Sequence, residues 1–278
     1  MKDIRKSICG RLYQVYNLIK YKDSLAVFWY SGINFGDALN PYFISKITGK
    51  KCQLVVNPED TEILHYIVIG SSVDRATNKS IIWGAGYISE DRKFKSKPYK
   101  VCAVRGPKTR DRLIEEGVDC PEIYGDPALL LPRIYKPRIK KRYKLGIIPH
   151  YIDKKNPLLK KFQENEDVKI IDITKCNPYK VVNDILECDN IASSSLHGII
   201  IADAYQIPSR WIEFSDKVIG NGFKFYDYFL SVHKEPTPPL RMTENVTFNH
   251  ILQQCKYNKI DIDLEALIKA CPFNTNIF

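Results

Sequence analysis

The sequence predicts an α/β protein built from two Rossmann-like domains that face a central cleft. Short apolar runs of strand length alternate with helical patterns, and this alternation occurs twice along the chain. A basic, proline-containing stretch at 132–143 separates the two series and is typical of a linker. The 278 residues are enough for two domains of ordinary size. We therefore expect an N-terminal domain over 1–135 and a C-terminal domain over 136–278.

The first series contains four apolar runs, each bounded by glycine, serine or asparagine, as expected for buried parallel strands. They lie at 25–30, 66–70, 80–83 and 100–104. Helical patterns follow at 37–48 and 107–117. The second of these begins with proline and ends with glycine, which is the usual asymmetry of helix ends.

The second series repeats this arrangement after the linker. Strands are expected at 145–148, 168–172, 190–192 and 210–214, and helices between them at 157–164, 178–187 and 196–206. Three further helical patterns close the chain at 223–233, 244–255 and 263–271. Because ligands of open parallel sheets bind beyond the carboxyl ends of the strands, we expect the site in the cleft between the sheets.

The composition limits the classes of partner. A formal net charge of +10 favours anionic partners, although the basic runs at 93–100 and 136–144 can equally be solvated surface and linker. No zinc-finger spacing or aromatic RNA-binding motif accompanies the charge, so nucleic acid is not expected. Eight cysteines without a CxxC pair predict no metal site and indicate a reducing, cytoplasmic environment.

The first 22 residues form a basic pattern with apolar residues at helical spacing. Such a helix either rests on the anionic inner face of a membrane or packs on its own domain. No apolar stretch is long enough to span a bilayer.

A glycine-containing turn follows the first predicted strand, with Asn34, Gly36 and Asp37 in sequence. Glycine permits a tight turn, and the helix that follows offers backbone N–H groups to an anion or a hydroxyl. Asp37 is either the N-cap of that helix or a group that orients or deprotonates an acceptor hydroxyl.

Two further strand ends of the first domain carry candidate residues. Gly84 and Gly86 follow the strand at 80–83 and allow close backbone approach, but they lack the third glycine of a dinucleotide motif. Arg105 ends the next strand, where its planar fork suits a carboxylate or phosphate. The alternative for Arg105 is a structural ion pair with Asp126.

The second domain carries the strongest motif, a turn that leads from a strand into a helix. Its residues are Ser193, Ser194, Ser195, Leu196, His197 and Gly198. Three hydroxyls and the helix N-terminus make a cradle for phosphate, and His197 can give or take a proton there. The alternative is serine capping with a buried histidine.

Other candidates in this domain are His150, Lys217 and Lys224. His150 follows the first strand, and it either faces the ligand or is a satisfied loop histidine. The two lysines could neutralise phosphate. The aromatic residues around Lys224 either stack on a sugar or form helical core.

Five motifs together resemble the polysaccharide pyruvyl transferases in order and spacing. They are NFGDALN (34–40), WGAG (83–86), VRGP (104–107), GDPALLLP (125–132) and SSSLHGIIIADAYQIP (193–208), and the similarity extends over about 25–233. The resemblance implies a GT-B-like fold and transfer of pyruvate from phosphoenolpyruvate onto two hydroxyls of one sugar. The product is a cyclic ketal, phosphate is released, and no cofactor or metal is needed.

The resemblance also implies that Arg105 and His197 belong to the phosphoenolpyruvate site. In some relatives an arginine stands where this chain has Ser195. Lys217, Lys224 or Arg210 would then complete the anion site. The hypothesis is that His197 supplies a proton, Arg105 binds the carboxylate or phosphate, and Asp37 contacts an acceptor hydroxyl.

In this scheme the first domain binds the acceptor and the second binds phosphoenolpyruvate. The expected acceptor is a polysaccharide of the cell surface or its lipid-linked precursor at the inner membrane face. One alternative is a GT-B glycosyltransferase that uses a nucleotide sugar, with Glu213 or Asp216 near the ribose. Another is a non-catalytic protein that binds carbohydrate or membrane.

Overall fold

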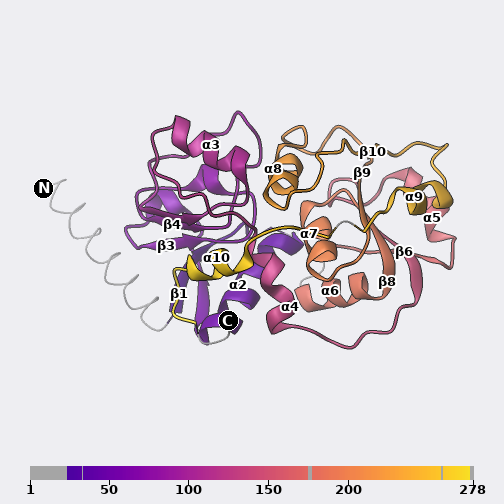
Figure 1. The fold of residues 1–278 in the computed structure, drawn as a ribbon, viewed down its shortest axis with the longest axis horizontal. Helices are drawn as coiled ribbons and strands as arrows, with labels where there is room; N and C mark the ends of the chain where they lie inside the picture. The colour runs from indigo at the N-terminus through magenta and orange to yellow at the C-terminus, as the bar shows by residue number, and fades with distance from the viewer. Residues whose placement is uncertain (1–23, 33, 175–176, 258, 276–278) are drawn as a thin grey trace, which may run out of the picture.

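The computed structural model describes residues 24–32, 34–174, 177–257 and 259–275, and it is an α/β structure with two five-stranded sheets (Figure 1). All strand pairings within both sheets are parallel. This arrangement agrees with the strand–helix alternation of the sequence. The N-terminal segment for which a membrane-contacting helix was expected lies outside the described residues.

The first sheet has the strand order β2-β1-β3-β4-β5. Its strands are β1 (Ser24–Phe28), β2 (Lys51–Leu54), β3 (His65–Ile67), β4 (Ser80–Trp83) and β5 (Lys100–Ala103), and its helices are α2 (Phe35–Thr48) and α3 (Pro107–Glu115). The strand β2 is not predicted by the sequence pattern, because it lies at the sheet edge and is exposed or half-buried along its length. An edge strand of this kind needs no continuous apolar run.

The second sheet has the order β10-β9-β8-β6-β7. Its strands are β6 (Tyr143–Ile148), β7 (Val168–Ile170), β8 (Cys188–Ser193), β9 (Ser209–Glu213) and β10 (Leu240–Arg241). The helices from the linker onward are α4 (Leu131–Ile134), α5 (Lys160–Gln163), α6 (Pro178–Leu186), α7 (Leu196–Ala204), α8 (Phe223–Ser231), α9 (Phe248–Gln254) and α10 (Leu264–Lys269).

Helix α10 does not stay with the second sheet. It lies beside the first-domain elements in Figure 1, and the Trp83 indole N–H donates to the Leu267 carbonyl oxygen at 2.9 Å. The rings of Tyr66 and Phe273 are 4.5 Å apart. The tail therefore returns to the first sheet because its apolar side chains are buried there. The division of the chain at residue 135 remains a prediction. The structure adds that the C-terminal tail packs on the first sheet.

One of the apolar clusters is shared by the two sheets. A single cluster of buried side chains includes Val27 and Phe35 from the first domain together with Ile148 and Ile199 from the second. Burial of apolar surface across the join stabilises the contact between the domains. The relative position of the strand ends of the two sheets is therefore fixed by packing.

Candidate functional site

Five buried ionisable side chains meet where the two domains join: Asp37, Arg105, His150, His197 and Lys224. The charges of His197 and Lys224 act on Asp37, those of Arg105 and Asp37 act on Lys224, and that of Lys224 acts on His150. Such mutual effects require proximity because the Coulomb energy falls with distance. All five were candidates from the sequence, and the structure brings them together.

Asp37 lies in the first turn of α2, which begins at Phe35 with Asn34 as its N-cap. The prediction that Asp37 itself could be the N-cap is therefore wrong, because the glycine turn ends two residues earlier than expected. Its carboxylate instead accepts hydrogen bonds from the Tyr30 backbone N–H at 3.2 Å and the Asn34 side-chain amide at 2.7 Å. Burial raises the pKa of Asp37, which makes the carboxylate a better proton acceptor.

The imidazole of His197 reaches from α7 into the first domain. A Cβ atom on Gly36 would lie only 2.0 Å from its Nδ1, so the ring packs directly on the α2 backbone and requires glycine there. On the other side, Nε2 lies 3.5 Å from the Asp126 Oδ2 atom. Both of these atoms are buried, and neither has a hydrogen-bond partner among the described residues. His197 is thus held between α2 and a carboxylate, with unused hydrogen-bonding capacity.

Arg105 is fully buried, and its guanidinium is bound on all sides by protein. Its Nε donates to Asp227 Oδ2 at 2.9 Å, Nη1 to the Ser71 hydroxyl at 2.7 Å and Nη2 to the Tyr87 carbonyl at 2.6 Å. The alternative that Arg105 pairs with Asp126 is wrong, because Asp126 faces His197 and its Oδ1 accepts from the Ala128 N–H. The donors Nε, Nη1 and Nη2 of Arg105 are therefore already bonded to protein. Arg105 affects the site through its positive charge rather than through a direct hydrogen bond to a ligand.

Asp227 completes this ion pair from the second domain. It lies on α8, is fully buried, and also accepts from the Thr109 backbone N–H at 2.9 Å and the Thr109 hydroxyl at 2.7 Å. Both carboxylate oxygens are therefore satisfied, as a buried charge requires. Through Arg105, which lies between β5 and α3, and Thr109 on α3, the first domain is thus connected to α8 of the second.

Lys224 is a buried cation that forms no ion pair with the described residues, although the charge of Asp37 acts on it. Only 9 % of it is exposed, and its ammonium makes no hydrogen bond or ion pair with another described residue. Burial and then the charge of Arg105 lower its pKa to about 8. Burial and then the charge of Lys224 lower the pKa of His150 to about 3, so its imidazole is neutral at physiological pH. The site thus contains the Lys224 ammonium and, near it, the neutral imidazole of His150.

Hydroxyls of the serine turn form hydrogen bonds within the protein, whereas the sequence predicted that they would bind phosphate. The Ser193 hydroxyl donates to the Ser195 carbonyl at 2.7 Å and accepts from its N–H at 3.0 Å. The Ser194 hydroxyl accepts from the His150 backbone N–H at 2.7 Å. Two of the three predicted phosphate-binding hydroxyls therefore shape the turn, because buried hydroxyls need partners. Ser195 is the N-cap residue of α7 and makes no side-chain capping bond.

The other predicted glycines and the second lysine have structural or peripheral positions. A Cβ on Gly86 would lie 2.4 Å from the Arg105 guanidinium carbon, and one on Gly84 would lie 2.2 Å from Pro127. A Cβ on Gly198 would lie 2.3 Å from the Ser193 hydroxyl. Lys217 is exposed and is not part of the buried cluster. Leu196 is buried as core.

Sequence reasoning missed Asp227 and Ser71 as partners of Arg105. A signal for Asp227 was present, since it is an acid among the aromatic residues of 223–229. A carboxylate on the apolar face of a helix is costly unless it meets a cation, so it indicates a buried partner. Ser71 carried no such signal, because its role depends on the fold.

Two other features, a metal-binding cluster and a membrane-spanning helix, are absent from the described part of the chain. It contains no cluster of three or more His, Cys, Asp or Glu side chains placed to hold a metal ion. None of its helices has the length and apolar character needed to cross a membrane.

The chain is similar in sequence to known proteins. The chain is 32% identical over 202 residues to the uncharacterised protein L143 of Acanthamoeba polyphaga mimivirus, which covers 70% of each protein. It is 29% identical over 157 residues to the succinoglycan biosynthesis protein ExoV of Rhizobium meliloti (strain 1021), which covers 55% of this chain and 48% of ExoV. No solved structure matches. The family model for polysaccharide pyruvyl transferase matches residues 6–216, a range that contains His197 and ends before Lys224. The chain belongs to the polysaccharide pyruvyl transferase family.

Proposed function

We propose that this protein transfers pyruvate from phosphoenolpyruvate to a sugar of a cell-surface polysaccharide or its lipid-linked precursor, and forms a cyclic ketal. The observation that carries the proposal is the buried cluster in which His197 and Asp37 lie beside the unpaired ammonium of Lys224. Family membership supports it. The lipid-linked form of the acceptor places the reaction at the cytoplasmic face of a membrane.

The donor requires cations because phosphoenolpyruvate carries a phosphate and a carboxylate. Lys224 is the direct ligand in this proposal, since its ammonium is buried and forms no ion pair or hydrogen bond with the described residues. Arg105 adds positive charge from behind it, and the N-terminus of α7 adds its dipole. Lys224 therefore supplies the charge that the Ser195 position does not.

In the proposed reaction, His197 and Asp37 each carry out one proton transfer. His197 protonates C3 of phosphoenolpyruvate, while the oxygen of the first sugar hydroxyl bonds to C2 and Asp37 accepts its proton. The adduct then loses phosphate as the bond between C2 and the phosphate oxygen breaks. The oxygen of the second hydroxyl bonds to C2 and closes the ring. The proton that Asp37 took from the first hydroxyl returns to His197 and replaces the one given to the methyl group, and the proton of the second hydroxyl leaves with hydrogen phosphate.

Lys224→Met is expected to raise the KM for phosphoenolpyruvate by about 10- to 100-fold, because it removes a charged hydrogen bond to the donor. The acceptor KM should change little. Steady-state kinetics of phosphate release measure both constants. Lys224→Arg should recover part of the donor affinity, and Lys269→Met, at an exposed lysine of α10, is the matched control. An unchanged donor KM in Lys224→Met would remove Lys224 from the donor site.

The same lysine predicts a pH dependence. Its pKa is lowered to about 8, so the ammonium is present below that pH and is lost above it. The affinity for phosphoenolpyruvate should therefore fall as the pH rises through about 8. Binding measured by calorimetry from neutral to alkaline pH checks this, and Lys224→Met should lack the dependence.

Mass spectrometry of an acceptor panel tests the function itself. The purified protein is incubated with phosphoenolpyruvate or with nucleotide sugars, and with galactose- or mannose-terminated oligosaccharides. A mass gain equal to pyruvate less water supports the proposal, and a hexose gain would replace it with glycosyl transfer. The structure disfavours the second outcome, since Glu213 and Asp216, the acids considered for a ribose, both bind Arg241 at 2.7 and 2.5 Å.

A further inference from the structure

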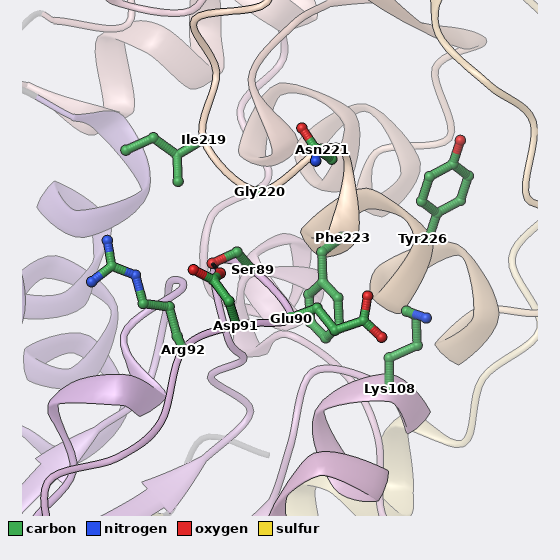
Figure 2. Close-up of a pocket in the computed structure, with 10 residues that line it drawn as sticks. All are labelled: Ser89, Glu90, Asp91, Arg92, Lys108, Ile219, Gly220, Asn221, Phe223 and Tyr226. Atoms are coloured by element: carbon green, nitrogen blue, oxygen red, sulfur yellow. Dashed lines mark hydrogen bonds between the residues drawn. The ribbon is translucent and has the colours of Figure 1, made fainter.

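A pocket of about 450 Å³ opens at the join between the domains, and the functional assignments above do not use it (Figure 2). One wall comes from the first domain, and the other from the segment before α8 and the first turn of α8. The first wall consists of Ser89, Glu90, Asp91, Arg92 and Lys108, and the second of Ile219, Gly220, Asn221, Phe223 and Tyr226. The two walls are in contact, because a Cβ on Gly220 would lie 2.2 Å from the Ile88 carbonyl oxygen.

The pocket lies where ligands of parallel sheets bind. Ser89 follows β4, and Lys108 is in the first turn of α3 after β5, so this wall is built at the carboxyl edge of the first sheet. The opposite wall follows β9 of the second sheet. A ligand here would contact both domains.

The lining has the chemistry of a site for an uncharged sugar. Asp91 accepts a hydrogen bond from the Ser89 hydroxyl at 2.5 Å, which lowers its pKa and keeps a carboxylate available for sugar hydroxyls. Glu90, the Asn221 amide and the half-buried ring of Tyr226 add acceptors, donors and an apolar face. Two acids face two bases here, so the pocket has no excess positive charge to attract phosphoenolpyruvate.

The pocket adjoins the donor cluster. Phe223 and Tyr226, three residues apart on α8, share one face of the helix, and Lys224 lies on the neighbouring face of the same turn. On the other wall, Ser89 is two residues after Tyr87, whose carbonyl oxygen binds Arg105. The pocket wall therefore includes Phe223, the residue next to Lys224 in the chain, so the same helical turn contributes to the pocket and to the donor cluster.

We propose that this pocket binds the acceptor sugar, as an uncharged saccharide unit, and holds it for attack on the donor beside Lys224. The assignment rests on the proposed function. The wall at 219–226 lies beyond residues 6–216, which the family model matches. The choice of acceptor therefore rests partly on a segment that family membership does not describe.

Two substitutions in the pocket test the assignment. Asn221 has a φ of 46°, so Asn221→Gly removes the amide while glycine keeps the left-handed backbone without strain. Glu90→Gln removes a carboxylate and keeps its shape. We expect the acceptor KM to rise about 2- to 10-fold in Asn221→Gly and about 10-fold or more in Glu90→Gln, with the phosphoenolpyruvate KM unchanged. Gln206→Gly, at another exposed residue with positive φ, is the matched control for the glycine variant.

A binding measurement separates this proposal from the proposed function. Saturation-transfer NMR with methyl glycosides of galactose, glucose and mannose reports sugar binding without any transfer. Binding to the wild-type protein that weakens in Asn221→Gly and Glu90→Gln supports the pocket, even if no pyruvate is transferred. Absence of saturation transfer to all of these glycosides, or equal transfer in wild type and both variants, overturns it.

Discussion

His197→Ala is expected to reduce pyruvyl transfer by about 100-fold or more, because a positioned proton donor contributes about 10²- to 10⁴-fold to catalysis. In the proposed mechanism, this ring protonates C3. Its Nε2 lies 3.5 Å from Asp126, and its other edge packs on Gly36 beside Asp37. Phosphate release in the presence of acceptor measures the loss, and mass analysis of the acceptor confirms that ketal formation falls in parallel.

His250→Ala is the matched control, since His250 is exposed at the start of α9 and lies outside the cluster. Thermal unfolding of both variants separates loss of the proton donor from loss of the fold. Turnover close to that of the wild type in a folded His197→Ala protein would exclude the catalytic role of His197.

Asp227→Ala is expected to lower the free energy of unfolding by about 3–5 kcal/mol, because it leaves the buried guanidinium of Arg105 without its counter-ion. Both side chains are fully buried, and the carboxylate also binds Thr109. Urea unfolding followed by circular dichroism measures the change. The double variant Arg105→Met/Asp227→Leu removes both charges and should recover much of the lost stability.

The matched control is Asp216→Ala, which removes an acid from the exposed ion pair with Arg241. Its effect should be small, because solvent screens surface pairs. A similar loss of stability in Asp216→Ala and Asp227→Ala would contradict the role assigned to the buried pair.

The architecture could be predicted from the sequence because buried parallel strands are continuous apolar runs. Three of the four residues of Ser80–Trp83 are buried, as are the last four residues of Tyr143–Ile148, and both strands lie close to the expected runs. β10 has only two residues and leaves no periodic signal. The return of α10 to the first sheet also left none, because Leu267 and Phe273 would suit either domain's core.

The site could be predicted in part, because polar residues at the carboxyl ends of parallel strands converge. In agreement with this rule, Asp37 lies near His197 and His150 lies near Lys224. The rule does not predict whether a given charged side chain is paired with another protein group or can bind a ligand. Arg105 and Lys224 are both buried cations, yet only Arg105 meets a carboxylate, and that depends on how α8 packs against α3. Partner choice of this kind is a property of tertiary packing.

The buried ion pair between Arg105 and Asp227 also restricts how the protein can move during turnover. A hinge opening between the domains would pull the guanidinium from its carboxylate inside the protein, at a cost of several kcal/mol. The shared apolar core adds to that barrier. We therefore expect a preorganised enzyme. Substrates would diffuse into a site that is already formed, and the two domains would not close around them. Rearrangement in each cycle would be confined to side chains and to the exposed 90–92 loop at the pocket mouth.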